Sequence, residues 1–270
     1  MNFAALLKSE FRKLIYSRST WWLLGGATAF ASLSIAVMPV VLTAGFTSSA
    51  LGAGSPLMNQ DVVNAMYGKA TAGYYFAMIL GAMILAGEFA KGTAIATFLA
   101  APKRQSVLFA KITIAALTGL AVQLVSAAIA ALVGTLVLGA YEHVNPSASA
   151  FGDLALTAII SGVVMGLIGL SVGALIKNQT ASIVTLLAWM FLIDPILTAV
   201  LGSMQNEGSK YLFTSLIAGM MDLHISSVAS KNPMSSIEFL PPLVSVALLV
   251  GYAAVLVATA LSTSMRRDID

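Results

Sequence analysis

An all-helical integral membrane protein with six transmembrane helices is the fold class that this sequence predicts. Hydrophobic residues make up 59% of the 270 residues and charged residues 9%, and the mean hydropathy is +0.92. Soluble domains contain roughly 45–50% apolar residues, so part of this surface needs lipid around it. The apolar residues also fall into six long stretches, and the basic residues gather on one side of the expected membrane.

The six apolar stretches are long enough, at about 17 residues or more, to cross the hydrocarbon core as helices. Irregular backbone exposed to lipid is not tolerated at that depth. The first stretch is too long for the apolar part of a signal peptide, so we expect it to be retained. Residues 1–270 then form one transmembrane domain, with an initial helix at 1–20, the bundle at 21–262 and a tail at 263–270. The spans are predicted near residues 21–43, 70–87, 107–139, 154–176, 181–202 and 240–262.

Basic residues predict the orientation of these spans. All but three of the fourteen Lys and Arg residues fall on the side of the two termini, the exceptions being Lys69, Lys210 and Lys231. The positive-inside rule makes the side that carries the two termini cytoplasmic. Because the basic residues do not cluster on a soluble module, the net charge of +3 does not indicate nucleic-acid binding.

The first twenty residues predict a separate amphipathic helix. Its polar side carries Lys8, Arg12 and Lys13, and Trp21 marks the water boundary where the first span begins. We expect this helix to lie in the membrane interface, and the alternative is a plain cytoplasmic extension of the first span. Apolar side chains recur on one face at Phe3, Leu7, Phe11 and Leu14.

A charged connector, residues 87–111, follows the second span. Glu88 lies three residues before Lys91, and a surface pair of this kind contributes only about a few tenths of a kcal/mol. A binding surface is a better reason for the carboxylate. Gly92-Thr93 permits a bend and Pro102 breaks the helical pattern. We therefore expect a short helical excursion with an exposed docking surface, returned to the headgroups by three basic residues, Lys103, Arg104 and Lys111.

Two polar side chains fall inside predicted spans. Asp194 precedes Pro195, a pattern typical of an N-cap that restarts a broken helix. An intramembrane carboxylate is also a candidate substrate or ion contact. Gln123 favours a hydrogen bond between helices over a ligand contact. Both residues are candidates for lining a pathway through the membrane.

Four glycines in the fourth span recur at steps of four, three and four, on one helical face. This spacing permits close backbone approach, so the face is expected to pack on another helix, in this chain or in another. These residues are Gly162, Gly166, Gly169 and Gly173. In the long outer loop 203–239, residues 211–221 are apolar but too short to span, which indicates a re-entrant or interfacial segment.

Motifs for chemistry are sparse. The chain has no G-x-x-x-x-G-K-[ST] sequence and no cysteine, and its two histidines, His143 and His224, are far apart in sequence. We therefore expect no catalytic residue, no metal site and no ATP hydrolysis in this chain.

The connector resembles a known family. Glu88-Phe89-Ala90-Lys91-Gly92-Thr93, followed by Ala101-Pro102-Lys103-Arg104 and Lys111, is similar to the E-x-x-x-G-T…P-x-R…K pattern after the second span of ABC-2 type transporter permeases. The resemblance implies a permease subunit of a bacterial cell-membrane exporter that works by alternating access. Its partners would be two separate ATP-binding subunits, which hold ATP and Mg, and a second permease subunit, identical or related.

In that family the connector contains the coupling helix that docks on the ATPase. Carried over, the coupling interface would comprise Glu88, Phe89, Lys91, Gly92, Thr93, Lys103 and Arg104. Two other classes stay open: an ion-coupled secondary transporter or channel that uses Asp194, and a membrane immunity or structural subunit whose outer segment 203–239 binds an extracellular peptide.

Overall fold

The computed structural model describes residues 3–45, 55–93, 104–204, 206–220 and 239–266. All regular structure within these ranges is helical. The elements are α1 (Phe3–Ile15), α2 (Arg18–Gly45), η1 (Pro56–Met58), α3 (Gln60–Tyr67), η2 (Gly68–Gly73), α4 (Tyr74–Ala90), α6 (Arg104–Leu138), α7 (Ala148–Ile176), α8 (Gln179–Ala188), η3 (Trp189–Ile193), α9 (Asp194–Ser203), η4 (Glu207–Tyr211), α10 (Phe213–Met220) and α11 (Pro242–Arg266).

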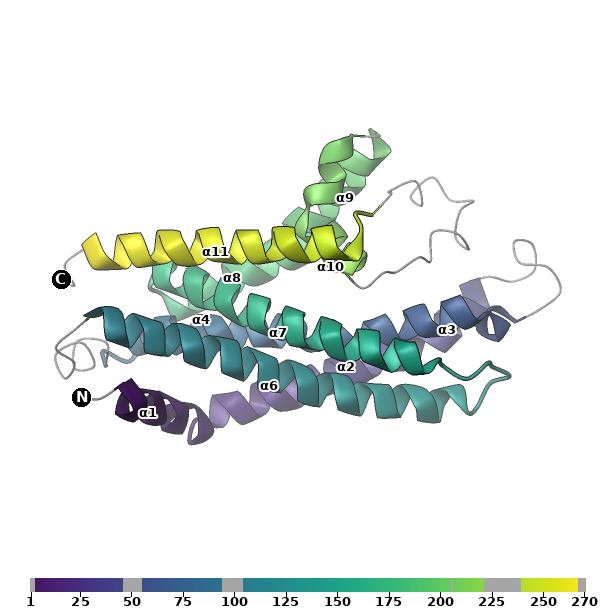
Figure 1. The fold of residues 1–270 in the computed structure, drawn as a ribbon, viewed down its shortest axis with the longest axis horizontal. Coiled ribbons are helices and arrows are strands. Elements are labelled where there is room, and N and C mark those ends of the chain that lie inside the picture. Colours follow the sequence, from purple (N-terminus) through teal and green to yellow (C-terminus); the bar gives the residue numbers. More distant parts are fainter. Residues whose placement is uncertain (1–2, 46–54, 94–103, 205, 221–238, 267–270) are drawn as a thin grey trace.

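Six helical segments of the described chain are long and apolar enough to cross a membrane, which confirms the predicted six-helix bundle. They are Arg18–Thr43, Gln60–Ala90, Gln105–Leu138, Ala148–Ile176, Gln179–Ser203 and Pro242–Thr263. The start of α1 and the end of α11 lie at the same end of the bundle (Figure 1), as an even number of crossings requires.

The second segment begins about ten residues earlier than the sequence predicts. Lys69 and the polar residues near Gln60 hid the start, because a hydropathy pattern ends where charge appears. In the structure α3 runs through the 3₁₀ helix η2 into α4, and Gly68 and Gly73 both keep helical backbone angles.

The helix α1 is separate from α2, with a turn at residues 16–17 between them. The indole Nε1 of Trp21 donates a 2.9 Å hydrogen bond to the carbonyl of Ile15 and fastens this turn. Two residues of the predicted apolar stripe, Phe3 and Phe11, are exposed, whereas Leu6 and Glu10 are buried. The face of α1 that packs on the protein therefore lies beside the stripe that the sequence singled out.

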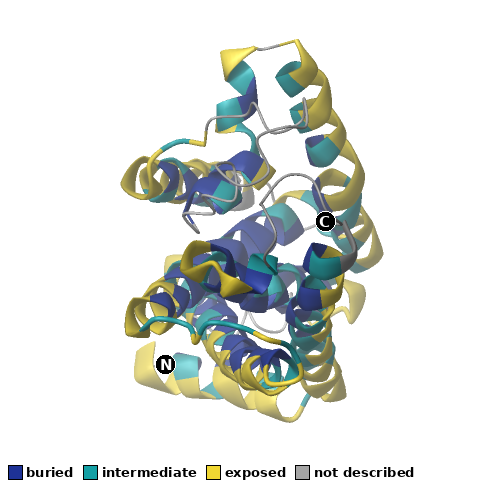
Figure 2. Cartoon of the chain, turned by 90° about the vertical axis from the view of Figure 1, so that its right-hand side faces the viewer, coloured by how far each residue is buried: buried dark blue, intermediate teal, exposed yellow. Residues whose placement is uncertain are grey.

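The helix α7 lies at the centre of the bundle and packs mainly on α4 and α6. Buried residues gather there, and the outer helical faces are exposed (Figure 2). A Cβ added at Gly162 would lie 2.7 Å from the Gly119 carbonyl oxygen of α6, and one added at Gly173 would lie 2.5 Å from the Ala82 carbonyl oxygen of α4. The glycines thus serve two neighbouring helices of the same chain, not one.

The fifth span is continuous where the sequence predicted a break. Between α8 and α9 the chain forms the π-helix η3, so a wider turn replaces the restart expected at Asp194. The helix α9 and the following η4 project away from the rest of the bundle (Figure 1). The helix α10 falls in the predicted re-entrant segment and packs on α11.

Candidate functional site

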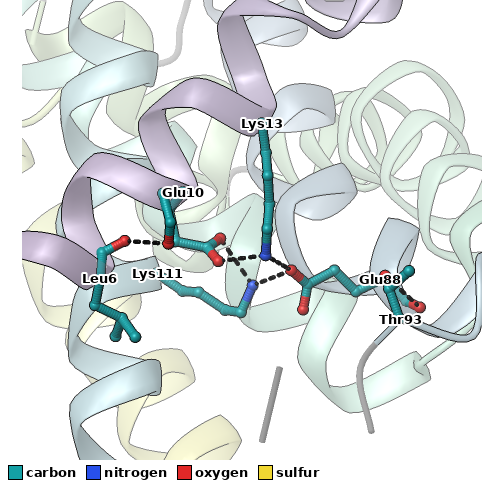
Figure 3. Close-up of polar contacts among 7 residues, drawn as sticks. Leu6, Glu10, Lys13, Glu88, Thr93 and Lys111 are labelled. Atoms are coloured by element: carbon teal, nitrogen blue, oxygen red, sulfur yellow. Dashed lines mark hydrogen bonds and ion pairs between the residues drawn. The ribbon is translucent and has the colours of Figure 1, made fainter. Parts of the chain in front are cut away.

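Four charged side chains from three helices, two of them at the ends of the connector, meet and form the ion-pair cluster (Figure 3). Glu10 and Lys13 come from α1, Glu88 from the last turn of α4, and Lys111 from the second turn of α6. Glu10 and Lys13 share a face of α1 because residues three apart are helical neighbours. The cluster thus ties the first helix to the two helices that enter the connector.

The distances in the cluster are those of charge-assisted hydrogen bonds. The ammonium of Lys111 lies 3.0 Å from Glu10 Oε2 and 2.8 Å from Glu88 Oε1. The ammonium of Lys13 lies 2.6 Å from Glu10 Oε1 and 2.8 Å from the same Glu88 Oε1. Two carboxylates and two ammonium groups balance, so the cluster adds no net charge to the interior.

The charge balance is important because three of the four side chains are buried. The Lys111 side chain is fully buried, the carboxylates of Glu10 and Glu88 are more than nine-tenths buried, and the Lys13 side chain is 47% exposed. Burial alone would raise the pKa of Glu10, but the charges and hydrogen bonds of Lys111 and Lys13 outweigh it and lower that pKa. Burial would lower the pKa of Lys13, but Glu10 and Glu88 raise it. Both groups are therefore held in their charged forms.

The end of α4 is shaped by glycine. Gly92 has a φ of +67°, in the left-handed region that only glycine adopts without strain. Beyond it, the Thr93 amide donates a 3.0 Å hydrogen bond to the Glu88 carbonyl oxygen. The bend predicted at Gly92-Thr93 is present at this position. Lys91 is exposed at the end of the helix, and the Lys177 ammonium lies 5.7 Å from the centroid of the Phe89 ring.

Two connector residues differ from their predicted surroundings. Glu88 is buried in the ion-pair cluster, not exposed on a docking surface, because Lys13 and Lys111 supply its partners in place of Lys91. Lys111 lies in the protein interior, not among headgroups, because two carboxylates neutralise it there. Arg104 begins α6, and Lys103 lies outside the described residues.

A pocket of about 650 Å³ lies next to the cluster. Glu10, Lys13 and Glu88 line one part of it, and Thr20 of α2 and Lys91 add further polar groups. The second oxygen of Glu88, Oε2, is buried without a hydrogen-bond partner. This oxygen can accept a hydrogen bond from a molecule in the pocket.

Asp194 is fully buried and caps a helix other than its own. Its Oδ1 accepts a hydrogen bond from the Phe213 amide at 3.0 Å, and its Oδ2 accepts one from the Thr214 amide at 2.7 Å. Both amides belong to the first turn of α10, where a carboxylate satisfies free N–H groups and the helix dipole. Sequence spacing predicted a cap within the fifth span, but the acceptor reaches across 19 residues to the outer segment.

Gln123 is fully buried, and its side-chain amide donates a 2.6 Å hydrogen bond to the Thr71 carbonyl of η2. It therefore links α6 to the start of the second span. His143 Nδ1 lies 2.8 Å from the Tyr141 carbonyl oxygen, and His224 lies outside the described residues. No group of three metal-ligating side chains occurs within the described ranges.

Sequence reasoning missed Glu10 and Lys13 as partners of Glu88. The available signal was an acid and a base three residues apart on the first helix, with the acid beside an apolar stripe. Comparison with known protein families and with curated proteins found no match to this chain. The geometry of the cluster and the connector sequence are therefore the basis for a functional assignment.

Proposed function

We propose that this chain is the transmembrane permease subunit of an ATP-binding cassette exporter, with both termini in the cytoplasm of a bacterial cell. The observation that carries the proposal is the ion-pair cluster. It joins α1, α4 and α6 at the point where α4 and α6 enter the connector, and the connector bears the permease-like sequence. A displacement of the connector would therefore move α1, α4 and α6 together.

The mechanism is alternating access driven by rigid-body movement. Closure of two ATP-binding subunits, which hold ATP and Mg, shifts the connector. The second and third spans follow as a unit, because Glu88 and Lys111 bridge them at 2.8 Å. Coupling requires a connector contact that differs between nucleotide states. The same proposal places α1 in the membrane interface and requires a second permease subunit beside this one.

Residues outside the ion-pair cluster provide the test. The chain is purified in detergent under conditions that preserve complexes, its partners are identified by mass spectrometry, and the eluate is assayed for ATPase activity. A variant with Lys91→Ala, Lys103→Ala and Arg104→Ala should lose the ATP-binding subunit but keep its fold. A matched variant, Lys210→Ala, carries its change on the predicted outer side and should retain it. Purification of the chain without any ATP-binding subunit or ATPase activity would refute the proposal.

The ion-coupled alternative gains no support from Asp194. Both of its carboxylate oxygens already accept backbone N–H groups of α10. A carboxylate that binds and releases an ion would have to break these bonds in each cycle, so the capping role is the simpler use of this residue.

A further inference from the structure

The pocket beside the ion-pair cluster combines two kinds of wall. Its polar part carries Lys13, Thr20, Glu88 and Lys91, and its apolar part is formed by side chains of α1 and α4. The apolar part includes Leu14, Leu80, Met83 and Ile84. A volume of about 650 Å³ falls within the roughly 300–1,000 Å³ of sites that take small molecules.

The pocket extends along the second span. Glu88 lies in the last turn of α4, and Leu80 lies eight residues earlier on the same helix. At 1.5 Å per residue these positions are about 12 Å apart along the helix axis. A cavity that runs from the charged end of a span toward its apolar middle fits an amphipathic molecule that enters from the bilayer. A cytoplasmic protein side chain would not reach that far.

Two buried polar atoms lack partners at this place. They are Glu88 Oε2 and the Thr20 hydroxyl, and both residues line the pocket. A carboxylate oxygen only accepts hydrogen bonds, whereas a hydroxyl can donate to an anionic oxygen. The ammonium of Lys13 donates to Glu10 and Glu88, so one of its three N–H groups is left for another acceptor. The pocket thus offers one acceptor next to several donors.

We propose that this pocket binds one phospholipid whose headgroup carries a free amine, of the phosphatidylethanolamine class. The headgroup ammonium donates to Glu88 Oε2, and the phosphate accepts from Thr20 and Lys13. One acyl chain packs along Leu80, Met83 and Ile84. The two opposite charges of the headgroup match the order of charges in the pocket. This site does not depend on the exporter function proposed above.

Native mass spectrometry of the delipidated protein tests the headgroup. Phosphatidylethanolamine, its N-methyl and N,N-dimethyl derivatives, and phosphatidylcholine with identical acyl chains are added at equal concentrations. The first three retain an N–H donor and phosphatidylcholine has none. A charge-assisted hydrogen bond corresponds to about tenfold in affinity, so binding should drop about tenfold at the last methylation step. Phosphatidylglycerol, which has the phosphate but no ammonium, should bind as weakly as phosphatidylcholine.

Two variants locate the site without changing the ion-pair cluster. Met83→Trp places a larger side chain in the apolar part of the pocket, and Thr20→Val removes the hydroxyl but keeps the side-chain shape. Both should lower retention of phosphatidylethanolamine, and Met204→Trp, at an exposed position directly after the end of α9, is the matched control for added bulk. Unfolding temperatures without lipid report whether each variant folds. Equal binding of phosphatidylethanolamine and phosphatidylcholine, strong binding of phosphatidylglycerol, or unchanged retention by folded Met83→Trp would each overturn the proposal.

Discussion

Replacing Lys111 by methionine is the sharpest perturbation of the ion-pair cluster. Methionine keeps an unbranched, flexible side chain of similar length but removes the ammonium. The Lys111 side chain is fully buried and binds Glu10 Oε2 at 3.0 Å and Glu88 Oε1 at 2.8 Å. After the change, two buried carboxylates share a single ammonium, that of the half-exposed Lys13.

The expected cost follows from the charge that is left behind. Removing one partner of a buried ion pair destabilises a protein by about 3–5 kcal/mol, because the other charge stays buried and uncompensated. The lower end, about 3 kcal/mol, applies here because Lys13 still binds both Glu10 and Glu88. Adding Glu10→Gln to Lys111→Met restores charge balance and should recover at least about 1 kcal/mol, as expected for residues in contact.

Denaturant unfolding in detergent measures these differences, followed by tryptophan fluorescence. Lys8→Met is the matched control, since Lys8 is exposed on the same helix as Glu10 and should change the unfolding free energy by no more than about 0.5 kcal/mol. If Lys111→Met were as stable as Lys8→Met, or if Glu10→Gln lowered its stability further, the cluster would not hold these helices together and the reasoning would fail.

Three further predictions concern helix packing, capping and pH. Gly169→Ala should lower the free energy of unfolding by about 1–3 kcal/mol, and with it the unfolding temperature, because the added Cβ would meet the backbone of α4. Gly152→Ala should leave the unfolding temperature unchanged, because its added Cβ meets no atom within 4 Å. Asp194→Ala should cost about 1–2 kcal/mol by uncapping α10, and limited proteolysis should then cut near residues 206–213 faster than in the parent protein. Because the pKa of Glu10 is lowered in the folded protein, Glu10 contributes stability at pH values above its ordinary pKa of 4.5. That contribution is lost as the pH falls through the pKa of the folded state. The free energy of unfolding, measured from pH 7 to pH 3, should therefore fall at low pH, and Glu10→Gln should reduce this fall.

The number of spans was predictable because each span is a long apolar stretch, which its length and hydropathy identify without knowledge of the packing. The start of the second span was not, since Lys69 and its polar neighbours lie in a helical stretch that packs on the rest of the bundle, with Val63, Tyr67 and Ala70 buried there. Hydropathy records which residues lipid tolerates. It does not record which polar residues a neighbouring helix can shelter.

Long-range partners were harder to predict than helices. Glu88 and Lys91 are close in sequence and were expected to share an exposed binding surface, yet Glu88 is buried and its partners lie 75 residues before it on α1 and on the next helix of the bundle. Asp194 gives the same lesson, because its Asp-Pro spacing predicted a local cap and its carboxylate reaches α10 instead. Sequence spacing finds residues with a polar role, but only the packed helices decide which groups they meet.

The buried position of Glu88 changes what a connector glutamate can do. An exposed carboxylate would bind a partner directly and be lost with little effect on the fold. A carboxylate held at 2.8 Å by Lys13 and Lys111 instead fixes how α1, α4 and α6 are arranged where the connector begins. Charge-neutral clusters of this kind have discrete arrangements, and a ligand or partner that favours one arrangement shifts the population toward it. Under the proposed function, Glu88 would transmit a displacement of the connector, and the exposed Lys91 is the better candidate for the docking contact itself.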